Sequence, residues 1–171
     1  MMTAIQMAAV PAPPLDLTLP DLAATESLGR ALARLLRPGD VIALSGDLGA
    51  GKTALARALI RALPGPQGAA DEEVPSPTFT LAQIYERRPG PVWHFDLYRL
   101  ESAAEVEELG FSEALAGIAL VEWPERLGAL LPADALQVTL TFVKPGVKTG
   151  EGGRLARLEG GGDWPHRLAE L

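Results

Sequence analysis

Apolar residues along this chain recur with the spacing of a strand in some stretches and of a helix in others. The two kinds of stretch alternate, which predicts strands alternating with helices. The runs at 41–44 and 117–121 are wholly apolar, as is typical of strands buried on both faces of a sheet. The last two predicted strands alternate and suggest a terminal hairpin. The stretches predicted as strands are 15–19, 41–44, 79–85, 92–95, 117–121, 136–142 and 154–158.

Helical spacing lies between these strands. Asp21 can cap a helix that carries leucines as far as Leu36 and ends at Pro38-Gly39. A second helix is expected over 54–63, and Ser102 with Glu105 forms a capping box before a third.

The order of elements predicts an α/β fold. We expect one domain over 15–171, a P-loop NTPase three-layer sandwich with a mixed, mostly parallel central sheet and antiparallel edge strands. Residues 64–73 are expected to form an exposed connection. Residues 1–14 are apolar and rich in proline without a period, and are expected to be a flexible leader.

Composition and charge narrow the function classes. The net charge of −7 argues against self-sufficient binding to nucleic acid, DNA included. The absence of cysteine excludes thiolate chemistry, and two histidines are too few for a histidine-built metal site. No apolar run is long enough to span a membrane, and no basic residue precedes Arg30, so we expect a cytoplasmic protein without a secretory signal.

One glycine-rich segment carries a complete phosphate-binding motif. Residues 46–53 read Gly-Asp-Leu-Gly-Ala-Gly-Lys-Thr and fit G-x-x-x-x-G-K-[ST] between a buried strand and a helix. In this motif, backbone N–H groups and the helix N-terminus attract phosphates. Lys52 would reach the β and γ phosphates, and the Thr53 hydroxyl would bind Mg²⁺. The alternative is a chance glycine-rich turn, but Lys52 is the only lysine before Lys144 in a chain with twelve arginines, as expected where a compact ammonium is needed.

We therefore expect ATP and Mg²⁺ as cofactors. The residues expected to contact the nucleotide through this motif are Gly46, Gly49, Ala50, Gly51, Lys52, Thr53 and Ala54.

Two carboxylates stand at the ends of apolar strands. Asp96 follows 92–95 and Glu122 follows 118–121. In a mostly parallel sheet both would open onto the edge that carries the phosphate loop. P-loop chemistry needs a carboxylate for Mg²⁺ and a group that orients the nucleophile there. An ordinary surface or helix-capping acid is the alternative for each. The sequence leaves open which carboxylate contacts the metal directly; we favour Asp96 for orienting the attacking water.

Three neighbouring features have less certain chemistry. Thr78 in Ser-Pro-Thr-Phe at 76–79 is either a switch that senses the γ-phosphate or metal, or part of a turn entering a strand. Trp123 is expected in the core rather than in the nucleotide pocket. His94 is expected to be structural rather than catalytic.

Taken in order, these motifs resemble the bacterial TsaE (YjeE) family. The matching strings cover about 19–132: the phosphate loop at 46–53, VPSPTFTL at 74–81, HFDLYR at 94–99, ELGF at 108–111 and LVEWP at 120–124. The resemblance implies an ATPase of the machinery that installs threonylcarbamoyl on a tRNA adenosine. It implies association with the TsaB–TsaD complex, and contact with tRNA only indirectly, through that complex.

The resemblance also implies roles for individual residues. The family's magnesium and catalytic carboxylates fall on Asp96 and Glu122, and its P-loop hydroxyl on Thr53. Thr78 is similar to a switch element. The stretch from Leu22 to Thr25 resembles the part that borders the base. Arg154 resembles a nucleotide-contacting arginine, next to a segment at 144–153 that is longer than in the family.

Other functions remain open on the sequence alone. A small-metabolite P-loop kinase would usually carry an arginine-rich lid, whereas the arginines at 87, 88, 99 and 126 are scattered. A non-catalytic ATP-sensing module is a further alternative. The chain contains no asparagine and hence no N-K-x-D guanine motif, so we expect ATP rather than GTP.

Overall fold

The computed structural model of the protein describes residues 12–143 and 153–171. Most of the expected leader at 1–14, and the lengthened segment around 144–152, lie outside the described residues. The described strands are β1 Leu15–Leu19, β2 Val41–Gly46, β3 Ala82–Tyr85, β4 Val92–Asp96, β5 Ile118–Glu122, β6 Leu136–Phe142 and β7 Arg154–Gly160. The helices are α1 Leu22–Ala33, α2 Lys52–Ala62, α3 Ala103–Glu108, α4 Phe111–Ala114 and α5 Trp164–Leu168, with 3-10 helices η1 Ala69–Asp71 and η2 Pro124–Leu130.

These strands form one mixed sheet in the order β1-β7-β6-β2-β5-β4-β3. The four central strands β6, β2, β5 and β4 pair in parallel. The β3 edge and the β7–β1 edge pair antiparallel, and β6 with β7 forms the predicted hairpin. The predicted α/β sandwich with a mostly parallel centre and antiparallel edges is confirmed.

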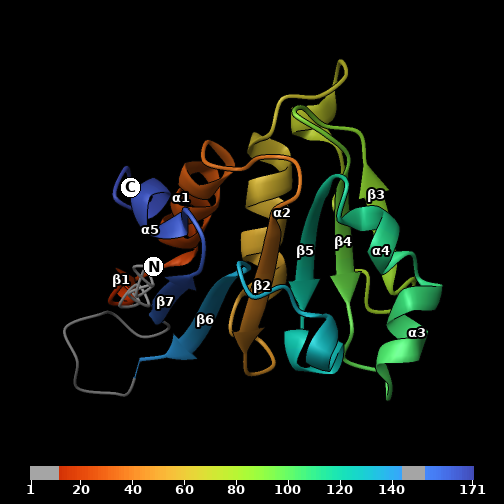
Figure 1. Cartoon of the computed structure of the whole chain (residues 1–171). Helices are drawn as coiled ribbons and strands as arrows, with labels where there is room; N and C mark the ends of the chain where they lie inside the picture. Colours follow the sequence, from red (N-terminus) through yellow and green to blue (C-terminus); the bar gives the residue numbers. More distant parts are fainter. Residues whose placement is uncertain (1–11, 144–152) are drawn as a thin grey trace, which may run out of the picture.

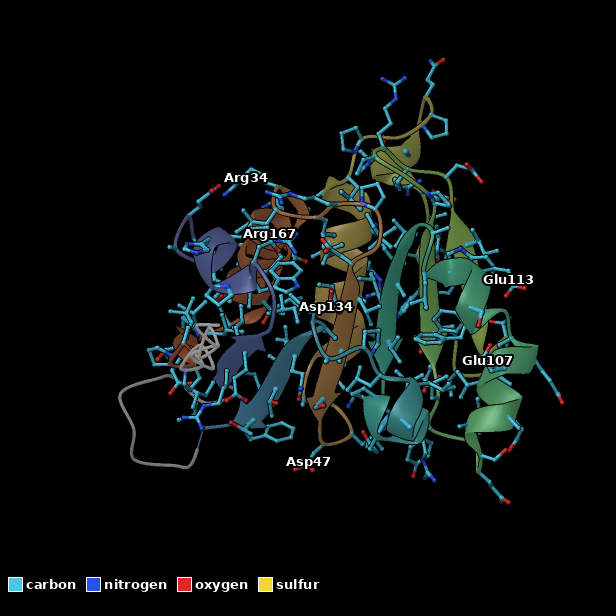
Figure 2. The ribbon with its side chains drawn as sticks, in the orientation of Figure 1. Arg34, Asp47, Glu107, Glu113, Asp134 and Arg167 are labelled. Carbon is cyan, nitrogen blue, oxygen red and sulfur yellow. The ribbon has the colours of Figure 1, made fainter. Side chains whose placement is uncertain are left out.

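Two hydrophobic cores cover the two faces of this sheet. Helices α1 and α2 contribute Leu32 and Leu59 to one core, together with every second residue of β2 and β5, such as Ile42 and Leu120. The intervening residues Val41, Ala119 and Val121 belong to the other core with α3, α4 and η2. Figure 1 shows the sheet with the carboxyl ends of β2, β4 and β5 at one edge, and Figure 2 places Asp47 at that edge. Central strands buried on both faces explain the wholly apolar runs in the sequence.

The predicted helix caps are present. The Asp21 carboxylate accepts a hydrogen bond from the Ala24 N–H at 2.8 Å, and Ser102 with Glu105 forms the full capping box. Helix α2 begins at Lys52, two residues earlier than expected, because Gly51 takes the N-cap position. Helix α1 ends at Ala33 rather than at Leu36, although Leu35 and Leu36 remain buried.

The prediction of a strand over 79–85 is wrong in its first part. Residues 77–80 form a turn, which the Leu81 N–H closes by donating to the Pro77 carbonyl, and the strand begins at Ala82. Phe79 is 81% exposed, so an apolar residue that fits a strand pattern here belongs to the surface. Within the described residues, no helix has both the length and the apolar character needed to cross a membrane.

Candidate functional site

The phosphate loop joins the end of β2 to the start of α2. Gly46 has φ +139°, and a Cβ placed there would collide with the Leu140 carbonyl oxygen of the adjacent strand β6. Gly49 and Gly51 also have positive φ, of +78° and +109°, but Gly49 faces open space. The first N–H groups of α2 have no partner within the helix and lie at this loop. The local backbone therefore requires glycine at 46 for packing and favours it at 49 and 51 for conformation.

Lys52 lies folded against this loop. Its side chain is buried, and Nζ donates to the Gly46 carbonyl at 2.6 Å and the Asp47 carbonyl at 2.9 Å. Burial lowers the pKa of the Lys52 ammonium below its ordinary value, while the carboxylates of Glu122 and Asp96 act in the opposite direction.

The aromatic ring of Trp123 lies over this ammonium, with Nζ 4.1 Å from the ring centroid. Trp123 is only half-buried and lines the same pocket, so the prediction of a core residue is only partly right. Its φ of +60° is rare for a bulky side chain. The cation–π contact helps to hold the ammonium at the loop.

The two predicted carboxylates meet at the edge that carries the loop. Asp96 and Glu122 are register partners at the ends of the parallel strands β4 and β5, and both are buried. Thr53, in the first turn of α2, donates its hydroxyl to Glu122, whose two carboxylate oxygens are each 2.9 Å away. One short contact thus links the P-loop hydroxyl to a strand-end carboxylate.

Asp96 is held from the other side. The Thr78 hydroxyl donates to Asp96 Oδ2 at 3.0 Å, and the Tyr98 N–H donates to Oδ1 at 3.1 Å. Ser76 Oγ lies 2.7 Å from the Thr78 hydroxyl. The Ser-Pro-Thr-Phe segment at 76–79 therefore contacts the site through Thr78.

His94 also contacts this cluster, which the sequence did not predict. Its ring is fully buried, and Nε2 lies 2.8 Å from Glu122 Oε1. A signal for this contact was available: residues two apart on a strand share a face, so His94 lies on the same side of β4 as Asp96.

A pocket of about 240 Å³ opens over the loop. Its lining consists of Leu48, Gly49, Gly51, Lys52, Thr53, Ala54, Ser76, Thr78, Asp96, Glu122 and Trp123. A second pocket of about 310 Å³ adjoins it and is lined by Asp21, Leu22, Thr25, Gly49, Ala50, Gly51, Ala54 and Arg154. Arg154 reaches the loop from β7, with Nε donating to the Ala50 carbonyl at 3.1 Å. The structure thus brings every predicted site residue to one continuous region.

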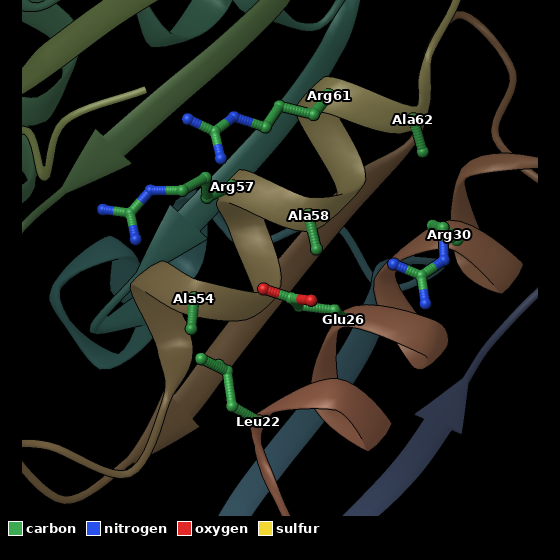
Figure 3. Close-up of a pocket in the computed structure, with 8 residues that line it drawn as sticks. All are labelled: Leu22, Glu26, Arg30, Ala54, Arg57, Ala58, Arg61 and Ala62. Carbon is green, nitrogen blue, oxygen red and sulfur yellow. The ribbon is translucent and has the colours of Figure 1, made fainter. Parts of the chain in front are cut away.

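A third pocket, of about 290 Å³, lies between α1 and α2 (Figure 3). Arg57 and Arg61 are among its lining residues, but Figure 3 shows both side chains directed away from Glu26 and from α1. Their Nε atoms donate to the Val74 and Glu72 carbonyls instead. This groove therefore lacks the converging donors of the phosphate-loop pocket.

The donor set at the loop fits a magnesium ion bound together with a nucleotide. Residues 12–143 and 153–171 contain no group of three or more histidine, cysteine, aspartate or glutamate side chains that could hold a metal. Mg²⁺ does not need such a cage, because it is usually bound by one or two carboxylates together with substrate phosphates and water. The Thr53 hydroxyl beside the Glu122 carboxylate provides oxygen ligands of that kind.

Comparisons with known proteins agree on one protein family. The family model described as "Threonylcarbamoyl adenosine biosynthesis protein TsaE" matches residues 19–147. A TsaE protein of Rickettsia felis is 43% identical over 117 residues, which cover 68% of this chain and 66% of that protein. A Synechocystis TsaE is 46% identical over 123 residues, covering 68% of this chain and 74% of that protein.

The fold has a solved counterpart. A crystal structure of Bacillus subtilis YdiB superimposes with a TM-score of 0.70 at 26% identity, covering 92% of this chain and 93% of that one. The family match extends over most of the chain, from the end of β1 past β6, and includes the phosphate loop and both strand-end carboxylates. The chain belongs to the TsaE family of threonylcarbamoyl adenosine biosynthesis proteins.

Proposed function

We propose that this chain binds and hydrolyses Mg-ATP, and that hydrolysis supports the threonylcarbamoyladenosine modification of tRNA by a complex with TsaB and TsaD. The observation that carries the proposal is the contact between Thr53 and Glu122 at 2.9 Å, next to a complete phosphate-binding motif. Family membership supports the link to tRNA modification. The matched stretch spans 66% of the Rickettsia felis protein, so the activity and partners of that whole protein are proposals for this chain.

The phosphates would bind at the start of α2. Backbone N–H groups of residues 49–53 and the Lys52 ammonium supply positive charge where the phosphates carry negative charge. Lys52 needs only to exchange its hydrogen bonds to the Gly46 and Asp47 carbonyls for phosphate oxygens. Its low exposure of 4% strengthens that interaction, because little water competes with it.

Magnesium would be held by Thr53 with Glu122. There the ion would neutralise the charge that develops on the phosphates. We assign Asp96 a different role, because Thr78 and the Tyr98 N–H already hold its two oxygens in place. A carboxylate held in this way can accept a hydrogen bond from the attacking water and orient it. The base would lie in the adjoining pocket between Leu22 and Arg154.

The proposal is tested by measuring ATP and GTP hydrolysis by the purified chain, alone and with TsaB, TsaD and unmodified tRNA. We expect slow hydrolysis of ATP that the partners stimulate, and loss of that stimulation in Glu122→Ala. Glu113→Ala is a matched control, because Glu113 is an exposed carboxylate in α4, away from the site. Hydrolysis that ignores the partners but rises with a small metabolite would instead indicate a kinase. Preference for GTP would contradict the nucleotide assignment.

A further inference from the structure

His94 is a buried polar side chain next to the proposed metal ligands. It lies on β4 between Val92 and Asp96, on the sheet face that α2 covers. Its ring is 0% exposed, and Nε2 is 2.8 Å from Glu122 Oε1. At this distance a proton on Nε2 would be donated to Oε1, and this is the tautomer that a carboxylate serving as a cation ligand requires, because such a carboxylate only accepts hydrogen bonds.

This hydrogen bond constrains a carboxylate that the P-loop hydroxyl also contacts. Glu122 is the last residue of β5, so its backbone is fixed by the parallel pairs on both sides of that strand. Its side chain still has three torsions, and the Thr53 hydroxyl lies equally far from both oxygens and therefore does not choose between them. The imidazole contacts Oε1 alone, and so it selects one orientation of the carboxylate plane.

The second nitrogen of the ring makes no such contribution. Nδ1 is buried and has no hydrogen-bond partner among the described residues. An imidazole with one unpaired nitrogen stabilises a core less than an apolar side chain of similar shape would. Packing alone therefore does not account for histidine here, whereas a donor at the Nε2 position does.

We propose that His94 is a positioning residue for Glu122, which its Nε2–H holds in the orientation that receives the Thr53 hydroxyl and the magnesium of the bound nucleotide. This inference rests on the proposed Mg-ATP function. It assigns His94 no contact with substrate: the imidazole acts only through Glu122. Groups that hold a metal-binding side chain in place commonly change metal affinity or activity by about 10–100-fold when removed.

The test compares His94→Gln, His94→Asn and His94→Leu in the full chain. The amide nitrogen of glutamine reaches as far from Cα as Nε2, whereas that of asparagine reaches only as far as Nδ1. The readout is the factor by which Mg²⁺ tightens the dissociation constant of a fluorescent ADP analogue, which involves no hydrolysis. We expect His94→Gln to retain most of that factor, and the Asn and Leu variants to lose about 10-fold or more of it. His166→Gln is the control, because His166 is an exposed residue of α5.

A double-mutant cycle separates positioning from general packing. If His94 acts through Glu122, adding His94→Leu to Glu122→Gln costs little further Mg²⁺ dependence, whereas a purely structural role makes the two losses add. The wild-type protein offers a second measurement, in which ¹⁵N NMR of the histidine rings should show a proton on Nε2 of His94. This measurement can overturn the role of His94 even where a variant fails to fold.

The outcomes distinguish this inference from the proposed function. A wild-type chain whose nucleotide affinity does not respond to Mg²⁺ would overturn both. A wild-type chain that responds, with glutamine no better than asparagine or leucine, would overturn only the role of His94. A His94 ring without a proton on Nε2 would overturn it as well.

Discussion

Replacing the first and second glycines of the phosphate loop by alanine should affect different properties of the protein. Gly46 is the last residue of β2 and pairs with Leu140 of β6, and a Cβ at this position would collide with the Leu140 carbonyl oxygen. Gly49 lies three residues further on, where a Cβ would meet nothing within 4 Å. The two substitutions add the same methyl group to the same loop, so each is the control for the other.

The expected difference follows from these surroundings. At Gly49, with φ of +78°, alanine pays only for the left-handed backbone, roughly 1–2 kcal/mol. At Gly46 the φ of +139° lies in a region almost restricted to glycine, and the backbone strain of alanine there costs roughly 1–3 kcal/mol. The collision adds roughly 1–3 kcal/mol, because a strand carbonyl cannot turn aside as a side chain can. Gly46→Ala should therefore destabilise the fold by about 2–6 kcal/mol, clearly more than Gly49→Ala.

The measurement is urea unfolding followed by circular dichroism, together with nucleotide binding at a temperature where both variants are folded. We expect Gly46→Ala to lower the free energy of unfolding, and Gly49→Ala to weaken nucleotide binding, because its methyl group would enter the space open to the phosphates. Equal unfolding free energies for the two variants would refute the argument from the Leu140 contact.

Three further predictions concern contacts away from the glycines. Asp40→Ala should destabilise the protein by roughly 2–3 kcal/mol in urea unfolding, because the buried Arg167 guanidinium loses the carboxylate that it contacts at 2.7 and 2.9 Å and keeps only Asp163 at 3.1 Å and the Leu35 carbonyl. Asp16→Ala, which breaks the exposed ion pair between Asp16 and Arg157, should change the unfolding free energy far less and is the control. Thr78→Ala should lower the ATPase rate by roughly 10-fold while Thr78→Ser retains most of it, because the hydroxyl donates to the Asp96 carboxylate. An unchanged rate in the alanine variant would show that this bond does not matter for turnover. Removal of Mg²⁺ with EDTA should abolish hydrolysis and weaken ATP binding, as a Mg²⁺ titration monitored by nucleotide fluorescence can check.

The sequence predicted the elements that depend on local interactions. The caps at Asp21 and Ser102 involve residues three apart, and the buried strands appear as uninterrupted apolar runs. The phosphate loop could also be predicted, because all of its parts lie within eight residues. The placement of Asp96 beside Glu122 also followed, since parallel strands end at the same edge of a sheet.

Contacts between distant parts of the chain could not be predicted from the local sequence in this way. Arg167 in α5 binds Asp40 and the Leu35 carbonyl, more than 120 positions earlier, and nothing in the local sequence marks α5 as an anchored helix. Phe79 misled the strand prediction for a related reason. It lies in a turn that the Leu81 N–H closes on the Pro77 carbonyl, and the neighbouring Thr78 contacts Asp96, 18 positions away in the chain.

The sheet register explains why His94, Asp96 and Glu122 can be buried together at this edge. On the face that α2 covers, β4 presents Val92, His94 and Asp96 in turn, and β5 presents Ile118, Leu120 and Glu122. That face thus changes from apolar to polar within two to four residues, just where the strands reach the phosphate loop. Each of the polar groups then has a partner nearby: His94 contacts Glu122, Glu122 contacts Thr53, and Asp96 contacts Thr78. A slip of one residue between β4 and β5 would place Phe95 beside Glu122 in register and turn His94 away from the carboxylate. The apolar residues deeper in the sheet, by fixing that register, therefore also determine the geometry of the proposed magnesium site.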